Sequence, residues 1–125
     1  MPENRLAGKW YSGIGSTLEL EVEGSLLRGS FESVEYSPSK KFPLVGVVDA
    51  DEGRPNRSLA FVISWIDDDP LRKKYRRSSS YTGQFHSDDD VNRVTSLIVN
   101  ETAEKKQYAS ILVSHDVFTR DVPSR

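Results

Sequence analysis

Three consecutive residues near the end of the chain, Ser114, His115 and Asp116, have the side chains of a nucleophilic catalytic triad. Adjacent residues of a strand point to opposite faces, so these side chains cannot converge on one reacting atom. The other histidine, His86, has no metal-ligand spacing relative to His115, and the chain contains no cysteine. The residue types therefore argue against nucleophilic catalysis, a metal site and disulfide or thiol chemistry.

A second set of polar residues falls near the ends of predicted strands that also carry large aromatic side chains. The polar members are Ser12, Ser16, Ser33, Ser79 and Asp116, and the aromatic ones are Phe31, Trp65 and Tyr81. A few polar groups among aromatic side chains are typical of a small-molecule pocket. The spacing fits equally well with serines that only cap turns. An enzyme with Asp116 as general base is a weaker hypothesis, because no nucleophile can be placed beside it.

The charge distribution gives no sign of a polyanionic partner. The 125 residues contain 17 Lys+Arg against 19 Asp+Glu, a net charge of −2, and the basic residues are spread out except in the segment from Asp67 to Arg77. This pattern argues against nucleic-acid binding. That charged segment is expected to be a solvated hairpin loop, and contact with an anionic partner is the alternative. No apolar run reaches membrane-spanning length, and the opening Met1–Arg5 is not a signal sequence. We expect one domain over residues 1–125, either intracellular or the mature form of a secreted protein.

The positions of apolar residues alternate with period two along the whole chain, which predicts an all-β protein. Turn residues separate the alternating segments, and none of them has a helical stripe of useful length. The expected strands are Gly8–Ser12, Thr17–Glu23, Leu26–Ser33, Phe42–Asp49, Leu59–Ile66, Ser78–His86, Asn92–Asn100 and Tyr108–Thr119.

Short connections between these strands favour an antiparallel up-and-down arrangement. Eight such strands can close into a barrel, which removes exposed edges and leaves room inside for side chains or one small ligand. An open sandwich is the alternative. Alternation places Phe61, Ile63 and Trp65 on one face of the fifth strand.

Apolar residues occur on both faces of the late strands. On the last strand, Leu112, Ser114 and Asp116 share one face, and Val113 lies on the other, as Val62 does on the fifth strand. This pattern predicts that the outside of the barrel is covered by another subunit.

Several stretches, in order along nearly the whole chain, resemble the avidin and streptavidin family. They are Leu6–Tyr11, Gly15–Leu18, Leu27–Ser33, Phe61–Trp65, Tyr81–Phe85 and Ser110–Thr119. The resemblance implies an eight-stranded up-and-down β-barrel that binds biotin non-covalently in its lumen, without catalysis and without a further cofactor.

The resemblance also implies which side chains contact the ureido ring of biotin. In the family an Asn, a Ser and a Tyr donate hydrogen bonds to the ureido oxygen, and the matching residues here are Ser12, Ser16 and Phe31. Phe31 has no hydroxyl and Ser12 is shorter than Asn, so this oxygen is expected to have fewer donors. The ureido N–H groups are expected to donate to Asp116 and Ser33.

Other positions are matched to the sulfur, the carboxylate and the walls of the biotin site. Ser79 matches the hydroxyl near the thioether sulfur, and the valeryl carboxylate is matched to the loop that contains Ser37 and to the region from Arg77 to Ser79. Arg77 offers a charge-assisted contact that a serine would not. The positions of the family's hydrophobic box are matched by Trp65, Tyr81, Leu97 and Tyr108. The side chains expected to form the walls of the site are Trp65, Tyr81, Phe31, Leu97 and Val99.

Members of the family are typically homotetramers or homodimers, and Tyr108 matches a position that one subunit lends to the pocket of another. The residues expected at the subunit interface are Val62, Ile98, Val113 and His115. Because ureido-oxygen donors and tryptophans are replaced, we expect weaker biotin binding than in streptavidin. The alternative is an avidin-like barrel that binds a different small ring ligand.

Overall fold

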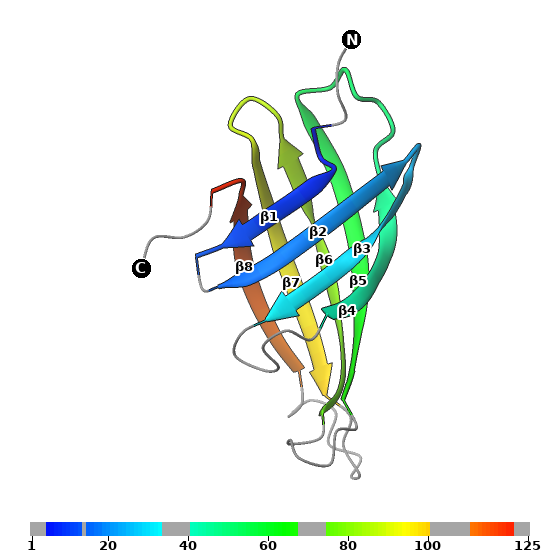
Figure 1. Cartoon of the computed structure of the whole chain (residues 1–125), viewed down its shortest axis with the longest axis vertical. Coiled ribbons are helices and arrows are strands. Elements are labelled where there is room, and N and C mark those ends of the chain that lie inside the picture. The colour runs from blue at the N-terminus through cyan, green and yellow to red at the C-terminus, as the bar shows by residue number, and fades with distance from the viewer. Residues whose placement is uncertain (1–4, 14, 34–40, 68–74, 101–110, 122–125) are drawn as a thin grey trace.

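The chain folds into one closed antiparallel barrel of eight strands in sequence order (Figure 1). The computed structural model describes residues 5–13, 15–33, 41–67, 75–100 and 111–121. The barrel closes where β1 pairs with β8, with Tyr11 opposite Thr119 and Ser12 opposite Phe118. The strands are β1 Gly8–Ser12, β2 Ser16–Glu23, β3 Leu26–Ser33, β4 Lys41–Val48, β5 Asn56–Asp67, β6 Tyr75–His86, β7 Val91–Asn100 and β8 Ile111–Thr119. The predicted barrel is confirmed, and the open sandwich is excluded.

β5 and β6 form a longer hairpin than the sequence predicts. Their pairing runs from Asn56 opposite His86 to Asp67 opposite Tyr75. β5 therefore begins at Asn56, three residues before the expected start at Leu59. The early part was missed because it is polar, although Arg57 is only 2% exposed and its Nε donates to the Asp49 carbonyl at 2.9 Å. The expected β8 residues 108–110 lie outside the described residues.

Alternation along β5 sends large side chains into the lumen, as expected. Leu59, Phe61, Ile63 and Trp65 are all buried, whereas Val62 between them is 51% exposed. A strand with one face in a packed lumen shows this pattern, because successive side chains point to opposite sides.

The inward face of β7 is the reverse of the one expected. Ser96 is 1% exposed and Leu97 is 42% exposed, so Leu97 points outward, with Val99 on the same face by alternation. Ile98, expected on the outside, lines the lumen. The prediction of the inward face was wrong because Leu97, Ile98 and Val99 form a continuous apolar run, while the inward Asn92 and Ser96 are polar.

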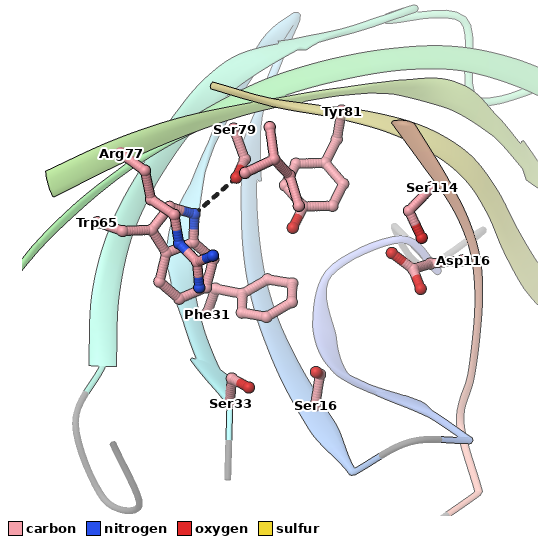
Figure 2. Close-up of a pocket in the computed structure, with 10 residues that line it drawn as sticks. Ser16, Phe31, Ser33, Trp65, Arg77, Ser79, Tyr81, Ser114 and Asp116 are labelled. Carbon is pink, nitrogen blue, oxygen red and sulfur yellow. Dashed lines mark hydrogen bonds between the residues drawn. The ribbon is translucent and has the colours of Figure 1, made fainter. Parts of the chain in front are cut away.

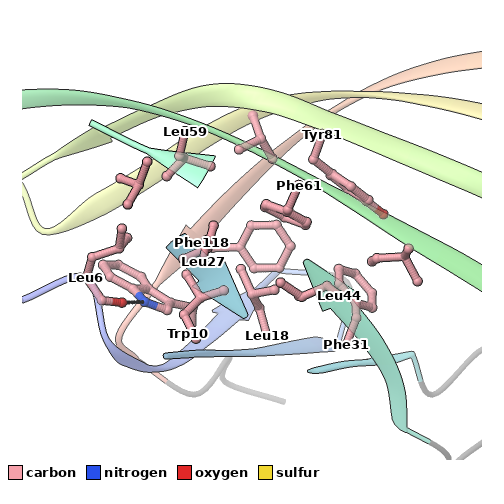
Figure 3. Close-up of a cluster of buried hydrophobic side chains, with 14 of the residues drawn as sticks. Leu6, Trp10, Leu18, Leu27, Phe31, Leu44, Leu59, Phe61, Tyr81 and Phe118 are labelled. Atoms are coloured by element: carbon pink, nitrogen blue, oxygen red, sulfur yellow. Dashed lines mark hydrogen bonds between the residues drawn. The ribbon is translucent and has the colours of Figure 1, made fainter. Parts of the chain in front are cut away.

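One end of the lumen is sealed by packed side chains around Trp10 (Figure 3). Trp10 is fully buried, donates its indole N–H to the Leu6 carbonyl at 2.8 Å and meets the Phe85 ring edge-on at 5.6 Å. The Arg120 guanidinium lies 3.7 Å from the centre of the Trp10 ring and donates to the Ala7 carbonyl at 3.1 Å. These contacts leave the other end of the barrel for a ligand.

Candidate functional site

A cavity of about 180 Å³ lies in the lumen, away from the Trp10 end (Figure 2). Six strands contribute to it, from β2 and β3 through β5 to β8. Its lining residues are Ser16, Phe31, Ser33, Trp65, Arg77, Ser79, Tyr81, Ile98, Ser114 and Asp116. The cavity can take one small ring ligand.

Three aromatic side chains form one wall of the cavity. Phe31 meets Trp65 edge-on at 5.2 Å and lies 5.8 Å from Tyr81. Behind them, Phe61 stacks on Tyr81 at 4.7 Å and Phe42 lies 4.7 Å from Trp65. Rings supported in this way from behind hold a firm apolar surface for a flat ligand.

Polar groups face this wall from the other side of the cavity. In Figure 2, Ser114 and Asp116 of β8 lie across from Phe31 and Trp65, and Ser16 lies on β2 between them. Such a cavity can bury a ring against the aromatic wall while its polar edge bonds to hydroxyl and carboxylate oxygens.

Ser79 links the polar and aromatic parts of the site. The Trp65 indole N–H donates to the Ser79 hydroxyl at 2.7 Å, and this bond fixes the plane of the indole ring. The hydroxyl proton of Ser79 is not used in that bond, so it can be donated to a ligand atom.

Ser12 has a structural role at the edge of the site. Its hydroxyl accepts a hydrogen bond from the Ser16 backbone N–H at 3.1 Å, and its side chain is 3% exposed. Ser12 does not belong to the lining residues. For this serine the turn-capping interpretation is correct, because its hydroxyl closes the turn between β1 and β2.

Asp116 is the only carboxylate among the lining residues of this cavity. Partial burial raises the pKa of Asp116 above its ordinary value, and the neighbouring His115 lowers that pKa by a smaller amount. The His115 ring points to the outer face, where its Nδ1 lies 2.9 Å from the Thr95 hydroxyl. Ionised Asp116 can accept N–H groups of a ligand, and its oxygens face a site that is partly shielded from water.

Seven of the twelve site residues expected from the sequence lie together in the cavity. They are Ser16, Phe31, Ser33, Trp65, Ser79, Tyr81 and Asp116. Leu97 and Val99 are not among them, because the face of β7 was assigned wrongly. Ser37 and Tyr108 lie outside the described residues.

Two lining residues were not expected from the sequence. Ser114 shares the inward face of β8 with Asp116, so alternation alone could have identified it. Ile98 could be identified only by extending the alternation along β7 from the inward residues Asn92 and Ser96, which are 1% exposed. The β7 side of the cavity therefore carries Ile98 where Leu97 and Val99 were expected.

A model of the avidin family matches residues 2–121, nearly the whole chain. The chain belongs to the avidin family. Proteins of the avidin family are non-catalytic binders, which agrees with a cavity built from aromatic rings, serines and one carboxylate.

Among the described residues of this avidin-family chain, no group of three or more histidine, aspartate or glutamate side chains could hold a metal ion. In the same part of the chain, no helix is long and apolar enough to cross a membrane.

Proposed function

We propose that this avidin-family protein binds biotin non-covalently in the cavity between β2, β3 and β5–β8. The observation that carries the proposal is that Asp116, Ser33 and Ser16 line the same cavity as the Phe31–Trp65–Tyr81 wall. The carboxylate and the Ser33 hydroxyl accept the two ureido N–H groups, and the rings pack against the bicyclic body of the ligand.

The proposed affinity is lower than that of streptavidin, whose complex with biotin is near the limit of non-covalent affinity. Phe31 carries no hydroxyl, and Ser12 does not line the cavity. Each lost hydrogen bond to a buried ligand atom costs on the order of 1–3 kcal/mol. Two such losses weaken binding strongly but leave an aromatic pocket with a charged acceptor.

Titration of the protein with biotin, followed by calorimetry and by thermal unfolding, tests this proposal. Biotin stabilises the native state only if it binds there, so the melting temperature must rise with its concentration. The Asp116→Ala variant loses the charged acceptor and most of this shift, whereas Asp88→Ala, a change in the exposed β6–β7 turn, keeps it. If the melting temperature does not rise at millimolar biotin, the proposal is contradicted.

The reduced number of donors near Phe31 favours one alternative, a different small ring ligand with fewer acceptors than a ureido group. The double variant Ser12→Asn, Phe31→Tyr separates the two. A modest gain in biotin affinity fits a biotin site with missing donors, whereas a protein that binds biotin only as the double variant has a different natural ligand.

We also propose that the protein self-associates through the outer face of β4–β8. Outward residues that are adjacent in register form a row across five strands, here called the outer row: Val45, Val62, Ser80, Leu97 and Val113. Its four apolar members are 42–66% exposed. His115 is the next residue of β8 that lies on the same face as Val113. Ile98 does not take part, because it points into the lumen.

An exposed apolar row of this kind is typical of an interface between subunits, and avidin-family proteins typically form oligomers. Sedimentation velocity at micromolar concentration tests the proposal. A single monomeric species would contradict it.

A further inference from the structure

A buried asparagine at the sealed end of the barrel has an amide group without a protein partner. Asn92 is the second residue of β7 and is only 1% exposed. In the strand register it lies between Phe85 of β6 and Phe118 of β8, and both of these rings are buried. Among the described residues, none forms a hydrogen bond with its Oδ1 or its Nδ2 atom. A buried amide without partners is costly, so these atoms call for a bound group that can donate and accept hydrogen bonds.

A further unpartnered atom lies two residues earlier, at the end of the β6–β7 turn. The Asp90 Oδ1 atom is buried and has no hydrogen-bond partner within the described part of the chain. The other oxygen, Oδ2, lies 3.5 Å from the Arg120 Nε, and the Arg120 guanidinium covers the Trp10 ring. Trp10 in turn meets the ring of Phe85, which is the register neighbour of Asn92. These contacts place the Asp90 carboxylate at the same end of the barrel as the Asn92 amide.

We propose that at least one internal water molecule bridges Asp90 and Asn92 at the start of β7. A water can accept a hydrogen bond from Asn92 Nδ2 and donate one to Asp90 Oδ1, so it joins a donor to an acceptor. Its second hydrogen can bond to a second water that donates to Asn92 Oδ1. Buried waters typically make about three hydrogen bonds to polar groups that have no other partner, which is the situation of these three atoms.

The charges around Asp90 favour water over an ion as the bound group. The Arg5 Nη2 atom lies 4.0 Å from Asp90 Oδ1, too far for a hydrogen bond, and Arg120 lies beside Oδ2. Two guanidinium groups repel a cation, and two side-chain oxygens are fewer than a hard cation takes. The carboxylate itself repels an anion. Because the site is at the sealed end, the inference does not depend on the proposed biotin function.

Oxygen-17 relaxation dispersion of water, which counts long-lived internal waters, tests this inference on the ligand-free protein. Asn92→Leu keeps the approximate size of the side chain but removes both polar atoms, so we expect the count to fall by at least one per chain. Asp90→Gly suits the positive φ of 55° at this residue and removes the acceptor, and it should lose the same water. Asp90→Asn keeps an acceptor oxygen and should retain it. Thr95→Val, a polar-to-apolar change on the exposed face of β7, is the matched control and should keep the count.

Thermal unfolding of the same proteins gives a second readout. Replacing a dry, unpartnered amide by leucine raises the melting temperature, whereas loss of a bridging water leaves Asp90 Oδ1 without its partner, so we expect no rise in Asn92→Leu. An unchanged water count in Asn92→Leu overturns the inference, and a higher melting temperature of that variant would then identify a dry amide. A water that is lost in Asn92→Leu but kept in Asp90→Gly also overturns it, because the bridge needs both residues.

Discussion

At the scale of single residues, Asp116 decides how the site responds to pH. Burial raises the pKa of its carboxyl in the folded protein, so between the ordinary carboxyl pKa and the raised value the folded state holds more protons than the unfolded state. The free energy of unfolding must then decrease as pH rises through this window. In the proposed biotin complex the affinity changes the other way, because the ionised carboxylate is a stronger acceptor for the ureido N–H than the neutral acid.

We therefore expect the Asp116→Asn variant, without ligand, to lose this part of the pH dependence of stability. Its melting temperature falls less than that of the unsubstituted protein as pH rises through the window, because an amide does not titrate. Biotin affinity of the unsubstituted protein increases with pH over the same window. Thermal melts and calorimetry at a series of pH values measure both effects, and identical slopes in the two proteins would show that Asp116 has no raised pKa.

Phe31 is the residue whose replacement should improve biotin binding. Phe31→Tyr adds a hydroxyl to a ring that already lines the cavity, at the position that the resemblance matches to a donor to the ureido oxygen. One added hydrogen bond is worth about 0.5–1.5 kcal/mol net, or roughly two- to tenfold in affinity. Calorimetry with biotin measures the gain.

Phe61→Tyr is the matched control for this change. Phe61 is buried behind Tyr81 and does not line the cavity, so the same added hydroxyl has no ligand to contact. An equal gain in both variants would mean that the effect does not arise at the ureido oxygen.

At the scale of the strands, Gly83 allows β6 and β7 to come close together. A Cβ built on Gly83 would lie 2.0 Å from the Arg93 carbonyl oxygen, which is backbone and cannot move away as a side chain can. Gly83 occupies an inward position between Tyr81 and Phe85, where both neighbours on the same face are buried. Glycines at such positions let the sheet bend into a barrel.

We expect Gly83→Ala to lower the free energy of unfolding by about 1–3 kcal/mol or more, because the two strands must separate. Gly13→Ala is the control, since a Cβ there meets nothing within 4 Å, and it should change stability by less than about 0.5 kcal/mol. Urea unfolding followed by tryptophan fluorescence measures both. Equal stability of the two variants would contradict the close approach.

At the scale of the whole molecule, the apolar residues that do not fit inside the barrel predict its assembly. Leu97 is the member of the outer row with neighbours on both β6 and β8, Ser80 and Val113. Leu97→Lys places a charge between Ser80 and Val113 on this surface, where burial against another subunit would be costly. We expect sedimentation velocity to show a smaller species or a weaker association constant than for the unsubstituted protein.

Glu21→Gln provides the control for this charge change. It also adds one positive unit, but on the exposed face of β2, away from the outer row. Loss of association in both variants would indicate a general charge effect rather than an interface at the outer row.

The sequence by itself determined the all-β class, the strand order and most of the cavity. These follow from local rules, because alternation of period two fixes which residues share a face wherever one face is clearly apolar, as in Phe61, Ile63 and Trp65. The avidin-like motifs then linked Asp116, Ser33 and Ser16 to one site, although they lie far apart in the chain.

Only the tertiary structure decided which face of β7 is inside and what each serine does. Leu97, Ile98 and Val99 are all apolar, so their sequence carries no alternation, and pairing with β6 and β8 sets the face instead. Ser12 and Ser16 look alike in the sequence, but the first caps a turn and the second lines the cavity. Closure of the barrel by the pairing of β1 with β8 brings Ser16 of β2 and Asp116 of β8 to one lumen, because it joins strands from the two ends of the chain.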